Sequence, residues 1–363
     1  MPSRRTRDPQ DVDIAWKFGP HVLELPLLAS AMDGVVSPEI AIALGRLGGL
    51  GVLNLEGIWT RYEDADAQLE KIAKLPKEQA TRGLQKIYAR PVEPKLIAER
   101  IGAIKKAGVL AAGSLTPQRV RDHYELALEA GLDVLVIQGT VVSAEHVSSN
   151  GQALNLKEFI AKLPIPVIVG GCASYQTALH LMRTGAEGVL VGVGPGHART
   201  TRGVLGVGVP QATAIADAAA ARVQHLLETG KYVNVVADGG MRTGGDIAKA
   251  IACGADAVMI GSPLARAKEA PGRGFHWGMA TFHPTLPRGA RVQVDQTASL
   301  EEIVVGPARE NDGTLNLMGA LRTSMATCGY ESIHEFQKAE IMLAPAINTE
   351  GKALQQAQRI GMG

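Results

Sequence analysis

The segment from Gly188 to Arg202 holds the residue types that an anion site needs. An apolar run, Gly188–Val193, predicts a strand of a parallel sheet that is buried on both faces. The chain then passes through Gly194-Pro195-Gly196, where missing side chains make unusual backbone angles inexpensive. His197, Arg199 and Arg202 follow. Bare N–H groups and positive side chains beyond a strand's carboxyl end favour an anionic ligand, although an ordinary glycine-proline loop remains the alternative for this segment alone.

Comparable loops follow other predicted strands. Asp238 precedes two glycines, and it could accept hydrogen bonds from ribose hydroxyls or cap the next helix. Ser30 and Asp33 follow a different strand, and each could also be a helix cap. Gly261-Ser262 stands where barrels often bind phosphate, and Gly278-Met279 either offers backbone groups to a flat base or forms a simple turn. Together the loops predict a site for a phosphorylated, ribose-like anion, and the residues alone name no substrate.

These loops need a scaffold that brings strand ends together. Eight apolar segments, most of them separated by helical patterns, indicate a (β/α)8 TIM barrel, with a doubly wound open sheet as the alternative. The predicted strands are Leu25–Ala31, Gly49–Asn54, Val109–Ser114, Val134–Gln138, Pro166–Gly170, Gly188–Val193, Val233–Ala237 and Ala257–Ile260. The predicted helices are Pro38–Leu47, Gln118–Ala130, Tyr175–Thr184, Thr213–Glu228 and Gly245–Cys253, followed by a short element at Leu300–Val305 and a helix at Leu315–Thr327.

Three segments depart from the alternating pattern of this single predicted domain, residues 1–363. Residues 1–20 are rich in charge and are expected to be an irregular lead-in. Residues 58–107 show no clear strand–helix alternation and predict an insertion or an irregular crossover. Residues 263–297 are rich in Pro, Gly, Arg and His. So long an irregular segment after the last strand predicts a functional flap.

Composition excludes several classes of protein. The net charge of +1 favours neither bulk nucleic-acid binding nor an anionic membrane surface. No apolar stretch is long enough to span a membrane, and the first residues lack an apolar signal core. The three cysteines, Cys172, Cys253 and Cys328, have no metal-type spacing and suit a reducing compartment. We therefore expect a cytoplasmic protein.

Ordered motifs at these strand ends resemble those of the IMP dehydrogenase/GMP reductase family over nearly the whole chain. The chain looks most similar to a short branch of the family that lacks the paired regulatory CBS domains, which the family inserts where this chain has residues 58–107. The matching motifs are Ser30-Ala31-Met32-Asp33, Gly192–Gly196, Thr200-Thr201-Arg202, Gly206–Gln211, Ala237-Asp238-Gly239-Gly240, Met259-Ile260-Gly261-Ser262, Gly278-Met279 and Gly319–Thr323.

The resemblance implies a role for each matching position. Asp238 would bind the ribose of a purine nucleoside monophosphate, IMP or GMP, and Met279 would offer backbone groups to the base. NAD or NADP would be the cofactor, and the family habit is a homotetramer. The other implied contacts are Ser30, Met32, Gly196, His197, Gly239, Gly240, Gly261, Ser262 and Gly278 for the nucleotide, Gln138 for the cofactor, and the carbonyls of Gly194, Gly196 and Arg199 for a monovalent cation such as K⁺, completed by Glu350-Gly351 of a neighbouring subunit.

Several positions differ from the family pattern. The catalytic position before Thr200-Thr201-Arg202 is Arg199, where the family has the cysteine that attacks the purine C2. A guanidinium stays protonated and offers no lone pair for attack. His197 replaces a phosphate-contacting serine, and Gln138 replaces an aspartate that holds the nicotinamide ribose. The dehydrogenase's water-activating Arg-Tyr pair has no counterpart in residues 280–297, where Arg288-Gly289 aligns loosely with the flap's Gln/Glu-Gly.

The resemblance thus implies an IMP dehydrogenase-like oxidoreductase of purine nucleotide metabolism that uses NAD, with catalytic positions at Arg199 and Thr201. The first alternative is a catalytically inactive purine-nucleotide sensor or pseudoenzyme subunit, in which His197, Arg199 and Arg202 favour a highly charged anion. Cys172 follows a predicted strand and could replace the missing nucleophile, although a small buried hydrophobe is the plainer interpretation. GMP reductase-like activity and an unrelated phosphate-handling barrel are weaker alternatives.

Overall fold

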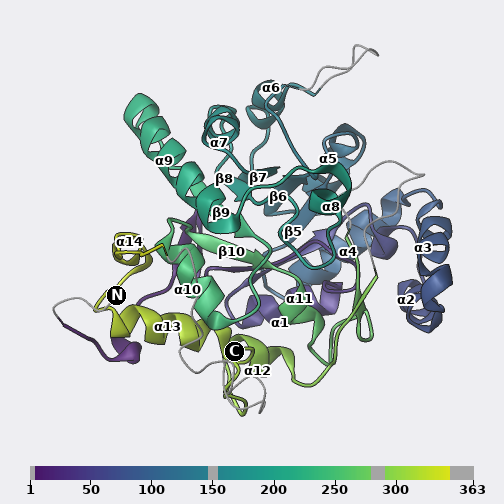
Figure 1. Ribbon diagram of the computed structural model, residues 1–363. Coiled ribbons are helices and arrows are strands. Elements are labelled where there is room, and N and C mark those ends of the chain that lie inside the picture. Colours follow the sequence, from purple (N-terminus) through teal and green to yellow (C-terminus); the bar gives the residue numbers. More distant parts are fainter. Residues whose placement is uncertain (1–4, 146–153, 279–290, 344–363) are drawn as a thin grey trace.

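Eight parallel strands close into a barrel in the computed structural model, which describes residues 5–145, 154–278 and 291–343 (Figure 1). Closure is direct, because Val258 of the last strand pairs with Leu27 of the first. The barrel strands are β3 (Leu27–Ala29), β4 (Leu50–Asn54), β5 (Ala112–Leu115), β6 (Val134–Gln138), β7 (Val167–Cys172), β8 (Gly188–Val191), β9 (Asn234–Asp238) and β10 (Ala257–Ile260). The predicted TIM barrel is confirmed, and the open sheet is excluded.

Helices surround the barrel and separate its strands along the chain (Figure 1). They are α1 (Pro38–Arg46), α2 (Ala65–Lys74), α3 (Ala80–Tyr88), α4 (Pro94–Lys106), α5 (Val120–Glu129), α6 (Leu156–Ile160), α7 (Tyr175–Met182), α8 (Thr201–Leu205), α9 (Gln211–Thr229), α10 (Gly244–Ala252), α11 (Ser262–Ala265), α12 (Leu300–Val304), α13 (Leu317–Thr327) and α14 (Ile333–Phe336). The predicted helices are confirmed with small shifts at their ends. The sequence patterns did not reveal the short helices α6, α8, α11 and α14.

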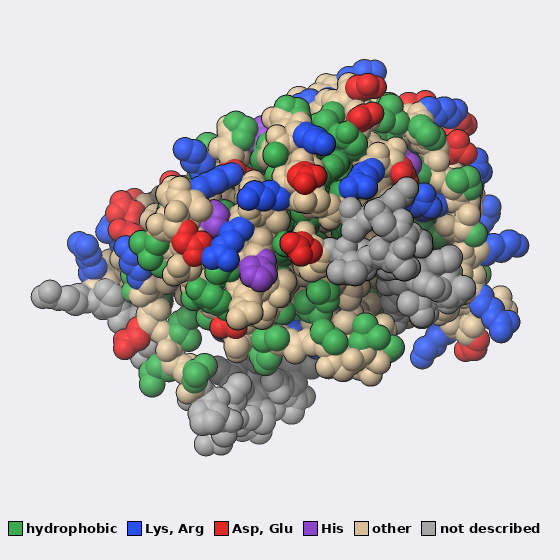
Figure 2. Space-filling model, turned by 90° about the horizontal axis from the view of Figure 1, so that it is seen from above, with side chains coloured by type: hydrophobic (Ala, Val, Ile, Leu, Met, Phe, Trp, Pro, Cys, Tyr) green, Lys and Arg blue, Asp and Glu red, His purple; other side chains and the backbone are tan. Residues whose placement is uncertain are grey.

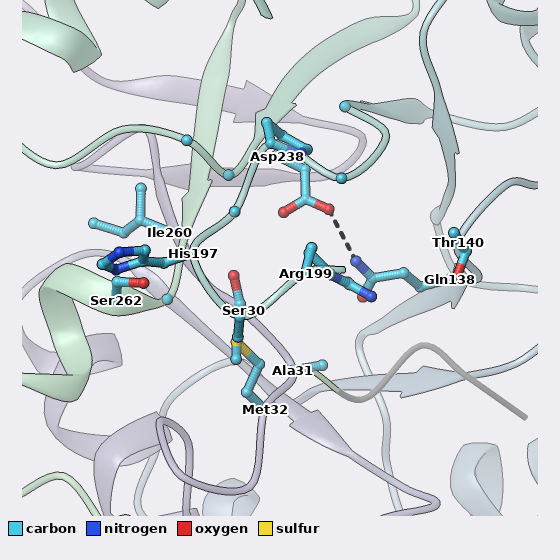
Figure 3. A pocket seen from close by; sticks show the side chains of 18 of the residues that line it. Ser30, Ala31, Met32, Gln138, Thr140, His197, Arg199, Asp238, Ile260 and Ser262 are labelled. Atoms are coloured by element: carbon cyan, nitrogen blue, oxygen red, sulfur yellow. Dashed lines mark hydrogen bonds between the residues drawn. The ribbon is translucent and has the colours of Figure 1, made fainter. Parts of the chain in front are cut away.

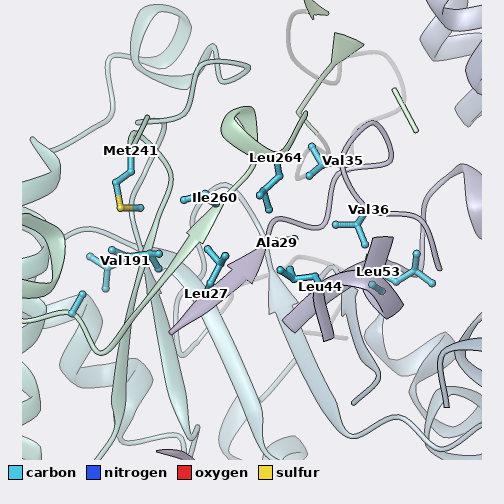
Figure 4. Packing of buried hydrophobic residues seen from close by; sticks show 14 of the residues in the cluster. Leu27, Ala29, Val35, Val36, Leu44, Leu53, Val191, Met241, Ile260 and Leu264 are labelled. Atoms are coloured by element: carbon cyan, nitrogen blue, oxygen red, sulfur yellow. The ribbon is translucent and has the colours of Figure 1, made fainter. Parts of the chain in front are cut away.

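The core has two layers because each barrel strand is buried on both faces. Alternate residues such as Leu28, Val52 and Leu190 fill the barrel interior. Their neighbours on the strands, such as Leu27, Ala29 and Leu53, pack outward in the same cluster as Leu44 of helix α1 (Figure 4). This arrangement explains why the strands are continuous apolar runs without polar alternation.

The N-terminal segment ends in a hairpin, so the predicted irregular lead-in of residues 1–20 was wrong at its last residues. Strands β1 (Trp16–Phe18) and β2 (His21–Leu23) pair antiparallel. Trp16 and Phe18 are buried with the residues of the barrel interior. Trp16 Nε1 donates a hydrogen bond to Oδ1 of Asn234, the first residue of β9, at 2.9 Å. The hairpin therefore covers the end of the barrel opposite the predicted ligand loops.

Residues 58–107 are helical and not an irregular crossover. They contain α2, α3 and α4, and their buried residues continue the main core. Helix α3 also reaches the base of the flap, because Trp277 Nε1 donates to the hydroxyl of Tyr88 at 2.9 Å. Residues 58–107 thus support the flap, which follows the last barrel strand β10.

The predicted flap is partly regular. It begins with α11 and continues into a hairpin of β11 (Phe275–His276) and β12 (Val292–Gln293), and residues 279–290 lie outside the described residues. Arg291 anchors the hairpin by donating to the carbonyl oxygen of Leu75 at 2.7 Å. The flap is therefore held by contacts to the α2–α3 region.

The surface agrees with the near-neutral charge of the sequence. On the face shown in Figure 2, basic and acidic side chains are interspersed. Among the described residues, no helix combines the length and the apolar character that a membrane span requires.

A capping threonine fixes the start of α10, which follows the Asp238 loop. Thr243 Oγ1 accepts a hydrogen bond from the N–H of Asp246 at 3.3 Å. We expect Thr243→Ala to lower the free energy of unfolding by about 1 kcal/mol, because one helix N–H loses its partner. Urea denaturation followed by circular dichroism measures this. Thr243→Ser keeps the hydroxyl and should change stability little; equal destabilisation by both variants would show that the cap contributes nothing.

Candidate functional site

One cavity lies where the barrel strands end, and its lining joins most of the predicted site residues (Figure 3). The loops after β3, β6, β8, β9 and β10 all contribute. The predicted residues in the lining are Ser30, Met32, Gln138, Gly194, Gly196, His197, Arg199, Thr201, Asp238, Gly239, Gly240, Gly261 and Ser262. Gly278 does not line the cavity, and Met279, Glu350-Gly351 and Arg288-Gly289 lie outside the described residues. The loops therefore meet as the barrel prediction requires.

The loops after β8 and β9 pack on each other through glycine. Gly239 and Gly240 both have φ of +82°, a left-handed conformation that glycine adopts without strain. A Cβ at Gly240 would lie 3.1 Å from Cβ of Pro195, and one at Gly239 would lie 3.4 Å from the backbone N of Gly196. The Cβ contact at Gly240 is tighter than an ordinary van der Waals contact, whereas the contact at Gly239 is ordinary, so the left-handed backbone is the reason that favours glycine at both positions.

Asp238 ends β9 and is the acidic group at one side of the cavity. Its Oδ2 accepts a hydrogen bond from Nε2 of Gln138 at 3.0 Å, drawn as the dashed line in Figure 3. Burial raises the pKa of Asp238, and Arg199 and the Gln138 hydrogen bond oppose that rise. The side-chain NH₂ group of Gln138 therefore donates to Asp238, and the side-chain carbonyl oxygen of Gln138 can accept a hydrogen bond from a ligand.

Arg199 occupies the middle of the cavity. Its half-buried side chain extends between Ser30 and Gln138 on the side of Asp238 (Figure 3). Arg202 behaves differently, because its Nε donates to the carbonyl of Val193 at 3.1 Å and its Nη2 to the carbonyl of Val209 at 2.6 Å. Arg202 is not part of the lining. Its predicted place in a cationic mouth was wrong: it holds the loop together instead.

Cys172 is a buried core residue. It is 1% exposed, its Sγ donates to the carbonyl of Leu190 at 3.4 Å, and it does not line the cavity. Burial raises the pKa of the thiol to about 12. The thiol therefore stays protonated at neutral pH, and the hypothesis that Cys172 replaces the nucleophile was wrong. Cys253 and Cys328 are the C-terminal caps of α10 and α13.

A second group of polar residues, from the ends of β4 and β5, lines the same cavity, and the sequence predictions missed it. Asn54 and Ser114 lie at or near the ends of β4 and β5. Glu56 accepts hydrogen bonds from the backbone N–H of Thr116 at 2.5 Å and from its hydroxyl at 3.1 Å. A polar residue at the end of an apolar strand, as at Asn54 and Ser114, was the sequence signal that could have identified them. His276 from the flap also lines the cavity and had no such signal.

Asp33 has a structural role. It is fully buried, and its Oδ2 accepts hydrogen bonds from the N–H of Ile58 at 2.8 Å and from the hydroxyl of Tyr88. The cap of α1 is Ser37, whose Oγ accepts from the N–H of Ile40 at 3.1 Å. The suggestion that Ser30 or Asp33 caps this helix was therefore wrong, and Asp33 instead joins the β3 loop to the segment after β4.

The donor set for a monovalent cation is incomplete among the described residues. The carbonyl of Gly196 already accepts a hydrogen bond from the N–H of Arg199 at 3.0 Å. No cluster of His, Cys, Asp or Glu suited to a metal occurs in the described part of the chain. A cation site at the carbonyls of Gly194, Gly196 and Arg199 remains a prediction.

The fold is a TIM barrel with a cavity at the carboxyl ends of its strands, the place where barrels of this kind carry their active sites. The model of the IMP dehydrogenase / GMP reductase domain matches residues 1–352. The chain therefore belongs to the IMP dehydrogenase/GMP reductase family.

Relatives of this chain are themselves of two kinds. An uncharacterized oxidoreductase of Mycolicibacterium smegmatis is 50% identical, over 93% of this chain and 92% of that protein. Inosine-5′-monophosphate dehydrogenase of Cryptosporidium parvum is 30% identical, over 91% of this chain and 86% of the other. A solved structure of an IMP dehydrogenase/GMP reductase-like protein from Corynebacterium glutamicum has 45% identity and a TM-score of 0.89, covering 95% of this chain and 92% of that one.

Proposed function

We propose that this protein binds a purine nucleoside monophosphate, with IMP as the first candidate, and does not perform the covalent reaction of an IMP dehydrogenase. The observation that carries the proposal is the cavity centred on Arg199 in which no thiol is available. Arg199 stands at the nucleophile position of the family motif. The alternative Cys172 is buried outside the cavity.

The proposed ligand lies along the row of loops. Asp238 accepts hydrogen bonds from the ribose hydroxyls, because an ionised carboxylate is an acceptor only. The backbone around Gly240, Gly261 and Ser262 receives the phosphate, as expected for bare N–H groups at strand ends. The base then lies over Met32 and Ser30, with the guanidinium of Arg199 beside it. Arg199 supplies a fixed positive charge and hydrogen-bond donors to the base.

The polar residues around Glu56 and Thr116 could hold a nicotinamide cofactor, which we propose as a second ligand of the cavity. Carboxylate and amide oxygens of Glu56 and Gln138 suit the hydroxyls of a cofactor ribose, and both residues line the same cavity as Arg199. NAD or NADP bound there would accept a hydride from the purine base. This observation favours a second candidate function, a noncovalent oxidoreductase that uses the same nucleotide site.

We also retain the homotetramer as a proposal. Val204, Leu205 and Val207, in and just after α8, are 74%, 65% and 46% exposed, and such apolar surface favours contact with another chain.

Calorimetric titration and an absorbance assay test the proposed function. We expect saturable heat with IMP, weaker binding of inosine, which lacks the phosphate, and no IMP-dependent NADH formation by the natural protein. The absence of heat with IMP, GMP and inosine would overturn nucleotide binding. Steady NADH formation would instead overturn the assignment as a nucleotide-binding protein without oxidoreductase activity, and it would support the second candidate.

A further inference from the structure

The inward-facing residues of two barrel strands change from apolar to polar at the level of the cavity. Every second residue of β6 faces the barrel interior, and after Val134 and Val136 the next one is Gln138. On β9, Asp238 follows Val236 in the same way. Gln138 and Asp238 therefore lie directly above the packed interior, and both line the cavity.

Gln138 and Asp238 meet although two strands separate them. The barrel order is β6-β7-β8-β9, so β7 and β8 lie between the two residues. Gly170 of β7 pairs with Gln138, and Gly192 directly follows β8. Neither glycine has a side chain that could stand in the way, and Nε2 of Gln138 donates to Oδ2 of Asp238 at 3.0 Å (Figure 3). The hydrogen bond thus joins two distant parts of the cavity wall.

This hydrogen bond fixes the direction of the Asp238 carboxylate. Rotation about the last bond of an aspartate side chain is broad, so a carboxylate without such a contact has no sharply defined plane. Burial raises the pKa of Asp238, and the charge of Arg199 and the amide of Gln138 oppose that rise. A charge attracts the carboxylate as a whole, whereas a hydrogen bond sets the position of the oxygen that accepts it. The second carboxylate oxygen then points away from Gln138 into the cavity (Figure 3).

A ribose is a ligand whose binding depends on that direction. Its 2′- and 3′-hydroxyls are neighbours, and they can donate to the two oxygens of one carboxylate only when the plane of the carboxylate faces them. Each oxygen of an ionised carboxylate has lone pairs for two hydrogen bonds, so Oδ2 of Asp238 can accept from Gln138 and from a hydroxyl together.

We propose that Gln138 is a positioning residue that turns the Asp238 carboxylate toward the ribose diol and thereby sets the preference of the site for nucleotides with both hydroxyls. The inference rests on the proposed function, because it assumes that a purine nucleoside monophosphate enters this cavity. Gln138 acts on the nucleotide through Asp238, and its carbonyl oxygen stays available to a second ligand. The position that the family resemblance assigns to the cofactor thus also serves the nucleotide.

Calorimetry on the full-length protein compares IMP with 2′,3′-dideoxyinosine 5′-monophosphate, which lacks both hydroxyls. The two ligands share base and phosphate, so the ratio of their affinities isolates the contribution of the diol. We expect the wild type to prefer IMP about a hundredfold, as two hydrogen bonds to a charged group would produce. Gln138→Met has a side chain of similar length without a donor, and it should lower this ratio about tenfold by weakening IMP alone.

Gln224→Met is the matched control. Nε2 of Gln224 also donates to a carboxylate, Oε1 of Glu228 at 2.9 Å, but this bond lies on the surface of α9 and Gln224 does not line the cavity. The affinity ratio should not change in this variant. A fall equal to that of Gln138→Met would overturn the inference, because it would not depend on the contact with Asp238.

A double-mutant cycle tests whether Gln138 acts through Asp238. In the Asp238→Asn background no carboxylate remains to be oriented, so adding Gln138→Met should change the affinity ratio by less than about twofold. A further tenfold loss in that background would show that Gln138 contacts the sugar itself, and it would overturn the positioning role.

The remaining outcomes separate this inference from the proposed function. Equal weakening of both ligands by Gln138→Met would indicate packing alone and would overturn the inference. If Gln138→Met does not fold by circular dichroism, Gln138→Asn decides the matter, because its amide is one carbon too short to reach Asp238. A wild type that binds both nucleotides equally well overturns the role of Gln138 and leaves nucleotide binding intact. Failure of the wild type to bind either one overturns the proposed function, and this inference with it.

Discussion

Replacing Arg199 by cysteine is expected to create IMP-dependent NADH formation that the natural protein lacks. The substitution puts a thiol at the family's nucleophile position, inside the cavity that is lined by the proposed nucleotide-binding loops. A thiolate can attack C2 of the hypoxanthine ring, and the C2 hydride then leaves to NAD, whereas a protonated guanidinium can start no such reaction. We expect a first-turnover rate at least about a hundredfold above that of Arg199→Ser, which has the same size but no thiol.

The gain should be a burst without sustained turnover. Hydrolysis of the covalent purine adduct needs an activated water, and residues 280–297 contain no tyrosine to match the family's Arg-Tyr pair. Stopped-flow absorbance should therefore record about one NADH per chain, followed by a slow phase. Mass spectrometry should find the nucleotide attached to the new cysteine. A burst of equal size in Arg199→Ser would contradict the mechanism, and no burst in Arg199→Cys despite calorimetric IMP binding would show that the base lies out of reach of residue 199.

Most of the fold could be predicted because the barrel strands are buried on both faces. Segments such as Val134–Gln138 and Ala257–Ile260 are apolar at nearly every position, and turn residues separate them from helices. The N-terminal hairpin was missed because its strands are three residues long and contain His21 and Lys17. Helices α2 and α3 carry many exposed charges, so their narrow apolar stripes did not stand out in the sequence.

The site residues likewise fall into those that could be placed from the sequence and those that could not. Gly239, Gly240 and Asp238 could be placed from the sequence because they directly follow a recognisable strand. His276 could not, since the flap has no periodicity that fixes which side chain faces the barrel. Arg202 was misassigned for another reason: a sequence reports a charge but not the carbonyl groups that engage it. Polar contacts formed between distant segments, such as Tyr88 with Asp33, are likewise invisible before the chain is folded.

Asp238→Asn is expected to reduce IMP affinity about a hundredfold while making the free protein more stable. A carboxylate that receives two ribose hydroxyls makes two hydrogen bonds to a charged group, and a carboxamide retains at most one of them without the charge. Isothermal calorimetry measures the loss. Asp122→Asn is the matched control, because Asp122 lies exposed on α5, outside the cavity lining, and forms a surface ion pair with Arg119 at 3.2 Å. IMP affinity should not change in the control.

The stability effect has a definite sign. Because burial raises the pKa of Asp238, the folded state holds the proton more tightly than the unfolded state, and stability is lost as the pH rises through that raised pKa. At pH 7 the ionised carboxylate therefore destabilises the free protein, and the neutral asparagine, whose side-chain oxygen can still accept from Gln138, removes this cost. Thermal melting without ligand should give a higher Tm for Asp238→Asn than for the wild type, with a difference that shrinks as the pH falls. A lower Tm together with unchanged IMP affinity would make Asp238 a structural residue and would move the ribose contact elsewhere in the cavity. A higher Tm with lost affinity is what a carboxylate retained for its ligand produces, since a residue kept for the fold alone would not oppose folding.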